Sequence, residues 1–340
     1  MSETKFVSVS AEHPEDTVIS EAALILDRGG LVAFPTETVY GLAADALNDS
    51  AIRKVFEAKG RPSDNPLIVH IAETTTLSSI SASFPEIGLT LARTFWPGPL
   101  TMVVQRTDRV SDLVTAGLDT VAVRMPNHPV ALSLIRKLGR GIVAPSANLS
   151  GRPSPTTAQH VHDDLNGRID YILDAGATRI GVESTVLDIT LTPPAILRKG
   201  GLSKEAIEAV VGEINSNGGS EYSNRSPGNR YRHYSPRACV HLVKEGDADE
   251  VIRLVNAEAA SGKRIGCILH SIPDGVSNSN VIVRIVPSDL EQISHLLFDL
   301  LRELDKSGVD MIVVEEVKET GLGAAIMDRL RRASAPSPKI

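Results

Sequence analysis

A polar stretch in the second half of the sequence divides it into two parts that must build separate cores. Residues 212–236 are rich in Asn, Ser and Gly and nearly devoid of aliphatic side chains, so they cannot bury enough apolar surface to form a core. A chain of 340 residues is also too long for one ordinary core. We therefore predict an N-terminal domain at 1–212, an interdomain linker at 213–237 and a smaller C-terminal domain at 238–340.

The second half of this linker has an unusual composition for a plain spacer. Between Arg225 and Arg237 it contains four arginines, two tyrosines (Tyr231 and Tyr234) and a histidine. A flexible spacer does not need this density of guanidinium and aromatic groups. The composition therefore favours a segment with a role beyond joining two domains.

Both parts that flank the linker alternate short apolar runs with amphipathic segments, which is the pattern of an α/β fold. The N-terminal part predicts strands at 31–34, 67–71, 99–105, 120–126, 142–146, 171–176, 184–190 and 195–200. It predicts helices at 14–28, 48–59, 85–95, 128–138, 156–165 and 203–211. The C-terminal part predicts strands at 239–243, 264–270, 280–286 and 311–317, with helices at 248–260, 288–307 and 323–333. We expect this second unit to be a compact α/β domain with a parallel sheet.

The stretch from Leu31 to Asp45 has a polar segment directly after an apolar run. Pro35 must end the strand because it has no N–H to donate, and Thr36, Glu37 and Thr38 follow it. In open α/β sheets, ligands bind at this kind of position, past the carboxyl end of a strand. The same residues also fit a simple turn with hydroxyl caps, and this stretch alone leaves both interpretations open.

Several other strand ends carry cations, hydroxyls or amides. They are His70, Arg124, Ser146 with Asn148, Ser184 with Thr185, and Arg198, while Lys59 and Arg61 follow the end of a predicted helix. Guanidinium and ammonium groups that converge with hydroxyl and amide donors suit a phosphate chain together with a carboxylate. Each residue singly also fits a solvated charge or a cap, and sequence spacing does not prove that they converge.

Charge, hydropathy and cysteine content exclude several classes of protein. The formal net charge of −7 argues against broad, charge-driven binding of nucleic acid. No apolar run approaches the ~18 residues that span a bilayer, and residues 1–16 lack the layout of a signal peptide. The two cysteines, Cys239 and Cys267, lie in apolar runs and are expected to be reduced core residues. We therefore expect a cytoplasmic protein that has no contact with a membrane.

Three common catalytic or binding patterns are missing from the sequence. It contains no G-x-x-x-x-G-K-[ST] phosphate loop, no Cys/His metal cluster and no G-x-S-x-G nucleophile elbow. His70 lies in an apolar run, where a lone histidine is more often a hydrogen-bonded structural residue than a ligand. His233, in a polar context, is freer to meet a ligand.

Six motifs follow one another along the chain. They are PTETVYGLAADA at 35–46, K-x-R at 59–61 followed by P-x-x-N-P-L-I-V-H, W-P-G-P-L-T at 96–101, V-A-V-R-M-P at 121–126, S-x-N at 146–148 and E-S-T-V at 183–186. Taken together, these motifs resemble those of the YrdC/Sua5 family, and the match covers essentially the whole chain. The linker sequence SPGNRYRHYSP at 226–236 resembles the two-domain Sua5 form. Any single motif is weak, but six in the family's order are highly specific.

The resemblance implies both a fold and an activity. The fold is a YrdC-like, twisted, mainly parallel sheet with helices around a positive cavity, plus a smaller Rossmann-like C-terminal α/β domain. The activity is that of an L-threonylcarbamoyladenylate synthase, a nucleotidyltransferase that joins L-threonine, bicarbonate and ATP and releases pyrophosphate. Its product feeds the t6A modification at position 37 of ANN-decoding tRNAs. Mg²⁺ would accompany ATP, with ligands that the sequence does not assign, and no organic cofactor is implied.

The resemblance also assigns roles to individual residues. L-threonine would be held by Thr38, His70, Arg124, the backbone of Ala144, and Ser184. ATP would be held by Arg61, Asn65, Thr120, Ser146, Ser154, Arg198, Tyr231 and Tyr234, the two tyrosines closing over the nucleotide from the linker. Lys59, Arg61 and Asn148 would be catalytic, with Lys59 and Asn148 neutralising charge near the reacting phosphate.

Two alternatives remain beside this interpretation. An RNA-binding module would use the same basic cavity, although the acidic net charge and the lack of interleaved aromatics in the N-terminal domain count against it. A carbamoyl-adenylate step in hydrogenase maturation uses a similar domain, but those proteins also carry zinc-finger cysteines, and this chain has only two distant cysteines. The C-terminal pattern permits a nucleotide site, a regulatory role or transient docking to tRNA-modification partners.

Overall fold

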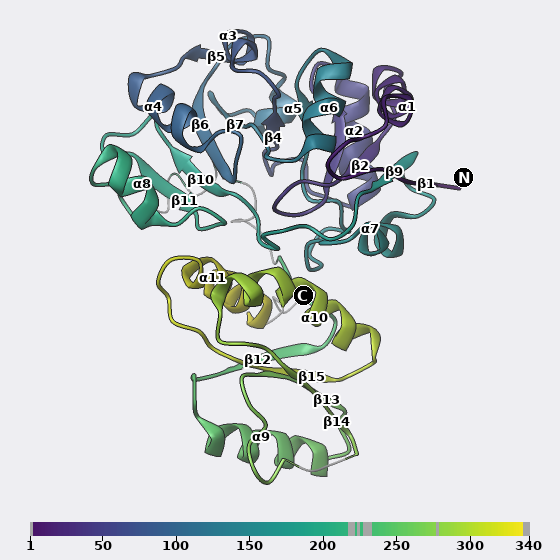
Figure 1. Ribbon diagram of the computed structural model, residues 1–340, viewed down its shortest axis with the longest axis vertical. Helices are drawn as coiled ribbons and strands as arrows, with labels where there is room; N and C mark the ends of the chain where they lie inside the picture. The colour runs from purple at the N-terminus through teal and green to yellow at the C-terminus, as the bar shows by residue number, and fades with distance from the viewer. Residues whose placement is uncertain (1–2, 217–221, 223–224, 227–232, 277–278, 336–340) are drawn as a thin grey trace. The chain divides into compact units, whose positions relative to one another are not determined.

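The computed structural model describes residues 3–216, 222, 225–226, 233–276 and 279–335. Contacts divide the chain into two compact units, one made of residues 1–150 and 154–230, the other of 151–153 and 231–340. Figure 1 labels the helices and strands of both units. The two units are described separately below.

The first unit is built on one large sheet. Its strands are β1 (Lys5–Ser8), β2 (Val32–Phe34), β3 (Gly41–Asp45), β4 (Ile68–His70), β5 (Ser81–Ser83), β6 (Leu100–Arg106), β7 (Thr120–Arg124), β8 (Ile142–Val143), β9 (Tyr171–Asp174), β10 (Thr185–Asp188) and β11 (Ala195–Arg198). They run in the order β1-β9-β2-β3-β8-β4-β7-β6-β10-β11, with β5 paired to β6. The central position of β4, β7 and β6 matters for the site, because these strands carry its buried polar residues.

The helices of this unit begin and end at residues that the sequence marks clearly. They are α1 (Asp16–Asp27), α2 (Asp49–Lys59), α3 (Leu77–Ile80), α4 (Glu86–Phe95), α5 (Asp112–Thr115), α6 (Pro129–Leu138), α7 (Ala158–Leu165) and α8 (Lys204–Val211), with a 3₁₀ turn η1 at Thr74–Thr76. For α2, the Asn48 side chain accepts from Ala51 N, and Gly60 ends the helix at φ +60°. This stop fixes Lys59 in the last helical turn and Arg61 just beyond it.

The predicted α/β class is confirmed, but the sheet is mixed rather than mainly parallel. Among the described strands, β1–β9, β2–β9, β4–β7 and β6–β10 pair in parallel, whereas β2–β3, β3–β8, β4–β8, β5–β6, β6–β7 and β10–β11 are antiparallel. The link between β2 and β3 spans only residues 35–40, which is too short for the crossover that parallel pairing requires. The sequence pattern also missed β3 itself, because Gly, Ala and Asp have little tendency to form strands.

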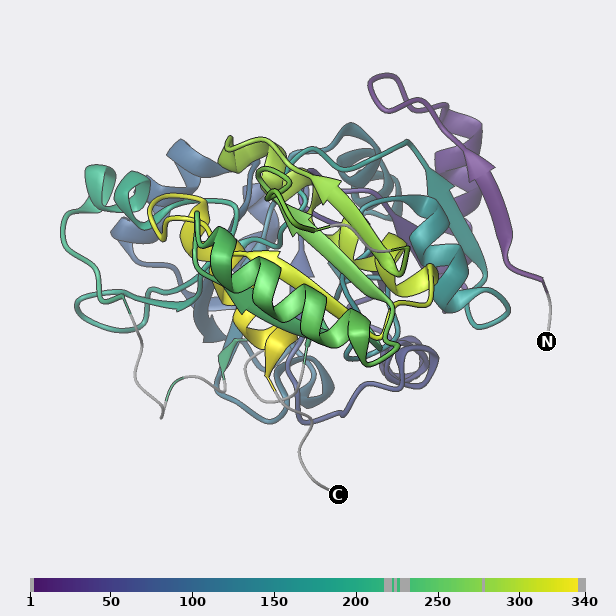
Figure 2. The same cartoon turned by 90° about the horizontal axis from the view of Figure 1, so that it is seen from below.

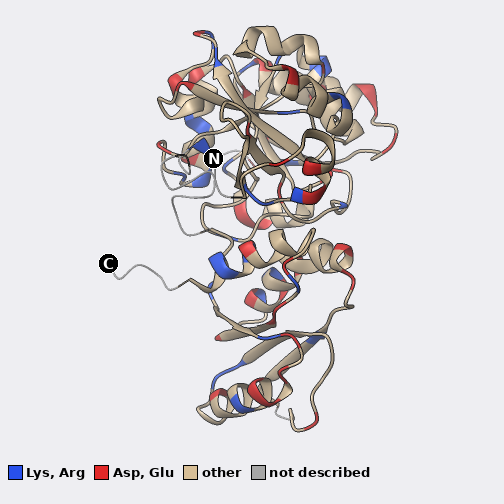
Figure 3. Ribbon diagram, turned by 90° about the vertical axis from the view of Figure 1, so that its left-hand side faces the viewer, with Lys and Arg blue, Asp and Glu red and all other residues tan. Residues whose placement is uncertain are grey.

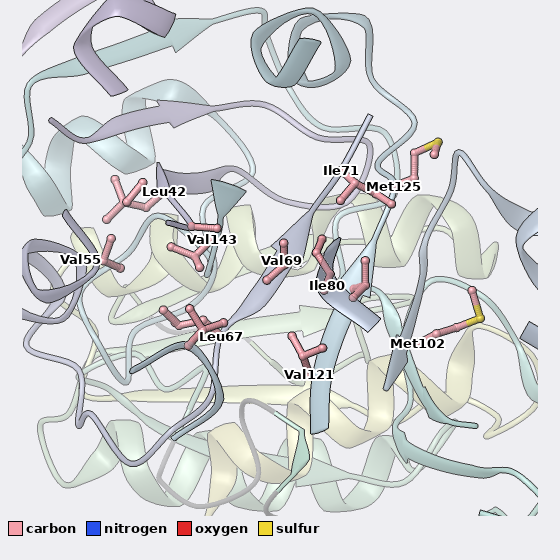
Figure 4. Packing of buried hydrophobic residues seen from close by; sticks show 14 of the residues in the cluster. Leu42, Val55, Leu67, Val69, Ile71, Ile80, Met102, Val121, Met125 and Val143 are labelled. Carbon is pink, nitrogen blue, oxygen red and sulfur yellow. The ribbon is translucent and has the colours of Figure 1, made fainter. Parts of the chain in front are cut away.

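Helices cover both faces of this sheet, and alternate residues of a strand enter different cores. Val32 and Phe34 pack with α1 and α6, whereas Ala33 belongs to a second cluster with Leu42 and Val55. Figure 4 shows side chains of this second cluster from several strands packed together. Strands β4, β7, β10 and β11 are buried along their whole length, so the polar side chains that they carry are buried too.

The second unit is a smaller parallel α/β domain, as predicted. Strands β12 (Cys239–Val243), β13 (Ile265–Leu269), β14 (Val281–Ile285) and β15 (Met311–Glu315) pair in parallel in the order β12-β15-β13-β14. Helix α9 (Ala248–Ala260) lies along one face, visible in front of the strands in Figure 2, and α10 (Leu290–Lys306) and α11 (Gly323–Ser334) lie on the other.

The prediction that both cysteines belong to the core is wrong for one of them. Cys267 is buried, and burial raises the pKa of its thiol to about 12. Cys239 is exposed, because it opens the edge strand β12 on the face opposite to the buried Val240. Both thiols are free. Within the described part of the chain, no helix has the length and apolarity that a membrane span needs.

Candidate active site

A row of buried polar side chains crosses neighbouring strands of the first unit. The sheet register places His70 of β4 opposite Arg124 of β7, and Arg124 opposite Thr101 of β6. Ser184 precedes β10, and its hydroxyl lies 2.8 Å from that of Thr101. Arg198, at the end of β11, donates from Nη2 to the carbonyl and hydroxyl oxygens of Ser184 at 2.9 and 3.2 Å. The structure thus brings four predicted residues together with Thr101.

The loop at 35–40 is both a turn and a wall of this site, so the two interpretations that the sequence left open are compatible. Thr36 Oγ1 donates to the carbonyl of Val39 at 2.6 Å and accepts from Thr38 N at 3.1 Å, which closes the turn. That turn holds the Thr38 hydroxyl 3.0 Å from Arg124 Nη1. Arg124 Nη2 also lies 2.8 Å from Glu37 Oε1, and both side chains are buried.

A second cluster forms where α2 ends. Lys59 is 2% exposed, and its ammonium donates to the backbone carbonyls of Ser146 and Asn148. The Ser146 hydroxyl donates to Asn148 Oδ1 at 2.6 Å. Gly41 forms an antiparallel bridge with Ser146, which connects this cluster to the segment that carries Thr38. The K-x-R motif at 59–61 and the S-x-N motif at 146–148, which are far apart in sequence, therefore meet in space.

Arg61 and Asn65 form a neighbouring pair in the loop after α2. Arg61 Nη2 donates to the carbonyls of Pro66 at 2.9 Å and Asn65 at 3.3 Å. The Asn65 side chain is buried, and neither its amide oxygen nor its amide nitrogen has a hydrogen-bond partner among the described residues. Because a buried amide normally has partners, Asn65 is a good candidate for a contact with a ligand.

The remaining predicted residues lie at different distances from the polar row. The Ser154 hydroxyl donates to Glu183, next to Ser184. The Ala144 amide donates to the Ile68 carbonyl at 3.1 Å, so a backbone contact to a ligand would use the Ala144 carbonyl. Thr120 opens β7, four residues before Arg124, and therefore lies roughly 13 Å along the strand from it.

The two linker tyrosines are not brought into this site by the described structure. Tyr231 lies outside the described residues. Tyr234 belongs to the second unit, where it is 5% exposed, stacks on Phe298 at 5.6 Å and lies 4.9 Å below the guanidinium of Arg329. In this position the Tyr234 ring is part of a packed core.

Sequence reasoning assigned no role to three residues that are buried in the site. They are Glu37, Thr101 and Glu183, which contact Arg124, Ser184 and Ser154 respectively. All three lie inside the motifs PTET, WPGPLT and ESTV. The sequence signal that could have identified these three residues is a polar side chain next to an apolar run. It does not reveal their contact partners, which are distant in sequence.

The electrostatics of the row keep His70 neutral. Burial lowers the pKa of His70 to about 3, and the positive charges of Arg124 and Arg198 act in the same direction. His70 Nδ1 lies 3.3 Å from the Ile68 carbonyl. A carbonyl oxygen only accepts, so Nδ1 carries the proton and Nε2 is left as an acceptor for a ligand.

This depressed pKa predicts a loss of stability in acid. As the pH falls below about 6.5, the unfolded chain binds a proton at His70 that the folded chain does not, so the free energy of unfolding drops by up to ~1.4 kcal/mol per pH unit until the pH nears 3. We expect His70→Gln to remove this slope. Urea unfolding between about pH 7 and 4, followed by fluorescence of the single tryptophan, Trp96, measures it. Equal acid slopes in the two proteins would contradict a buried neutral histidine.

These contacts define the class of protein as an α/β protein with a buried, cation-lined site at the ends of its strands. Residues 24–200 match the Sua5_yciO_yrdC family model, described as telomere recombination. Residues 202–335 match the Sua5_C model, described as the C-terminal domain of threonylcarbamoyl-AMP synthase. The chain therefore belongs to the Sua5/YrdC family, in the two-domain Sua5 form.

Full-length relatives agree with this placement. The chain is 49% identical over 327 residues to the threonylcarbamoyl-AMP synthase of Pyrococcus abyssi, covering 95% of this chain and 96% of that protein. It is 47% identical over 335 residues to the enzyme of the same name from Bacillus subtilis, covering 97% and 96%. The crystal structure of P. abyssi Sua5 complexed with L-threonine superposes with a TM-score of 0.91 at 47% identity, covering 97% and 98%.

Proposed function

We propose that this protein is an L-threonylcarbamoyladenylate synthase, which forms threonylcarbamoyl-AMP and pyrophosphate from L-threonine, bicarbonate and ATP. The observation that carries the proposal is the buried contact of Thr38 with Arg124 and of Ser184 with Arg198. Thr38, Arg124 and Ser184 lie in the motifs that resemble the family's. The names of the full-length relatives support the same activity.

The amino acid is proposed to bind at the Arg124 side of the row. Arg124 is the natural partner of its carboxylate, because guanidinium groups pair well with carboxylates in buried sites. The Thr38 and Ser184 hydroxyls are close to the two arginines and offer polar contacts. His70 Nε2 offers an acceptor, and the Ala144 carbonyl a second one.

ATP is proposed to bind across the residues that the resemblance assigned to it. They are Arg61, Asn65, Thr120, Ser146, Ser154 and Arg198, and the partnerless amide of Asn65 supports this placement. Lys59 ends α2, and its ammonium donates to the backbone carbonyls of Ser146 and Asn148. These contacts hold the positive charge of Lys59 in place. A fixed ammonium stabilises charge that develops on a phosphate without reorganising during the reaction.

The proposed chemistry depends on positioning and charge, and needs no protein nucleophile. Threonine and bicarbonate give an N-carboxylated threonine with loss of water, and the carbamate oxygen then attacks the α-phosphorus of ATP while pyrophosphate leaves. Such transfer is catalysed chiefly by orientation and by neutralising phosphate charge. Mg²⁺ would arrive with ATP and act on the phosphates. Among the described residues, no three His, Cys, Asp or Glu side chains gather as a metal site.

The proposal extends to the nucleotide contacts of the linker and to the use of the product. Tyr231 and Tyr234 are proposed to contact the nucleotide when ATP binds, which requires the Tyr234 ring to leave its packing on Phe298. A segment that closes in this way would exclude water from a labile mixed anhydride. The product is proposed to feed the t6A37 modification of tRNA in the cytoplasm, through transient contact with the proteins that use it.

A pyrophosphate-release assay tests the activity directly. We expect release from ATP to require both L-threonine and bicarbonate, and to fall strongly when serine, valine or allothreonine replaces threonine. RNA binding that weakens with salt, without any pyrophosphate release, would favour the RNA-binding alternative. Against that alternative, Figure 3 shows acidic and basic residues intermingled in both units, and the net charge is −7.

A further inference from the structure

Glu37 is a buried carboxylate whose polar atoms are incompletely satisfied. Its side chain is 2% exposed, and Oε1 lies 2.8 Å from Arg124 Nη2. Among the described residues, neither Glu37 oxygen accepts a hydrogen bond and Arg124 Nη2 donates none, so this contact is an ion pair without hydrogen-bond geometry. The Glu37 carbonyl accepts from Ile180 N at 2.8 Å, which fixes the backbone beneath the carboxylate.

The neighbours of Glu37 do not complete its hydrogen bonding. The Thr36 hydroxyl donates to Val39, and the Thr38 hydroxyl accepts from Arg124. Burial lowers the pKa of the nearby His128 and so disfavours a positive charge there, although the charge of Glu37 opposes that shift. A buried ion pair is favourable only when its remaining hydrogen-bond donors and acceptors are also satisfied. Glu37 therefore offers acceptors, and Arg124 a donor, to a ligand.

We infer that Glu37 receives the α-ammonium of the amino-acid substrate while Arg124 receives its α-carboxylate. This inference rests on the proposed function, because it assumes that an amino acid occupies the row. An α-amino acid carries opposite charges on adjacent groups of one carbon, which matches opposite protein charges held 2.8 Å apart. On binding, two protein–ligand pairs replace one protein–protein pair, and both partners gain hydrogen bonds.

The same arrangement explains why an acidic residue lies in a site for anions. A lone buried carboxylate would repel both ATP and bicarbonate. Paired with Arg124 in the empty site and with an ammonium in the loaded one, Glu37 presents no net charge to either anion. Glu37 thereby selects amino acids over hydroxy acids, because an α-hydroxyl in place of the ammonium leaves the carboxylate without a counter-charge.

Titration calorimetry on the full chain, without ATP, tests the inference. The two probes are L-threonine and 2,3-dihydroxybutanoate, which has an α-hydroxyl where threonine has its ammonium. We expect the wild-type protein to bind threonine at least about 100-fold more tightly. In Glu37→Gln the preference falls below about 10-fold, because the amide no longer favours a cation. A purely structural role for Glu37 would weaken both probes equally and leave their ratio unchanged.

Two further variants separate a direct contact from a general effect of charge or folding. Asp45→Asn removes one buried negative charge from an ion pair with Arg140, outside the polar row, and is expected to keep the preference for threonine. Glu37→Asp keeps the charge on a shorter side chain and is expected to retain the preference with weaker affinity, even if Glu37→Gln does not fold. Preference that survives in Glu37→Gln, or that is lost in Glu37→Asp, overturns the inference. Absence of threonine-dependent pyrophosphate release by the wild type counts instead against the proposed function.

Discussion

Lys59→Ala is expected to lower threonine- and bicarbonate-dependent pyrophosphate release by about 100- to 1,000-fold, the effect of removing one preorganised electrostatic contact. The buried ammonium is held by the carbonyls of Ser146 and Asn148, so its charge is already in place when the phosphate becomes more negative. Arg61→Ala is expected to cause a comparable loss, chiefly through ATP. Steady-state kinetics with ATP and threonine varied separately measure both effects.

A matched control is available on the same helix. Lys54 also lies in α2, and its ammonium donates to the Gly29 carbonyl at 2.7 Å, away from the S-x-N segment. Lys54→Ala is expected to keep wild-type turnover, and circular dichroism should confirm that all three variants fold. Normal turnover in both Lys59→Ala and Arg61→Ala would refute the assignment of these cations to the reaction.

Arg124→Met is expected both to abolish threonine-dependent turnover and to destabilise the N-terminal unit. Without Arg124, the carboxylate of Glu37 is left buried without its counter-charge, which typically costs ~3–5 kcal/mol. The double variant Arg124→Met/Glu37→Gln removes both charges and should recover much of the stability without recovering activity. This separation distinguishes the cost of an unpaired charge from the loss of a substrate contact.

Urea unfolding followed by Trp96 fluorescence, together with the pyrophosphate assay, measures the two effects in parallel. If the double variant is as unstable as Arg124→Met, the buried pair is not the source of the destabilisation. If Arg124→Met turns over threonine normally, Arg124 does not hold the substrate carboxylate.

Local signals in the sequence predicted the elements that end at the site. Asn48 and Gly60 mark the ends of α2, and Pro35 ends β2, because caps and proline act through neighbouring backbone groups. The position of Lys59 and Arg61 at a helix exit was therefore predictable. The resemblance to the family's motifs then indicated which of the polar residues at strand ends belong to one site.

Long-range pairing could not be predicted in the same way. The mixed sheet depends on which strands become neighbours, and the short Ala-rich β3 gives little indication that it pairs with β2 and β8. The contact between Glu37 and Arg124 joins residues that are far apart in sequence, and its burial comes from the surrounding fold. Similarly, nothing in the linker composition indicated that Tyr234 packs on Phe298.

The register between strands β4, β7 and β6 links the apolar core to the geometry of the site. His70, Arg124 and Thr101 lie side by side because Val69 pairs with Val123, and Val123 with Met102, one position away in each strand. Side chains alternate between faces, so a shift of one residue would exchange the arginine for a valine in the site. Core substitutions that change only size therefore leave the polar row aligned, whereas an insertion or deletion within these strands would turn it away from its ligands.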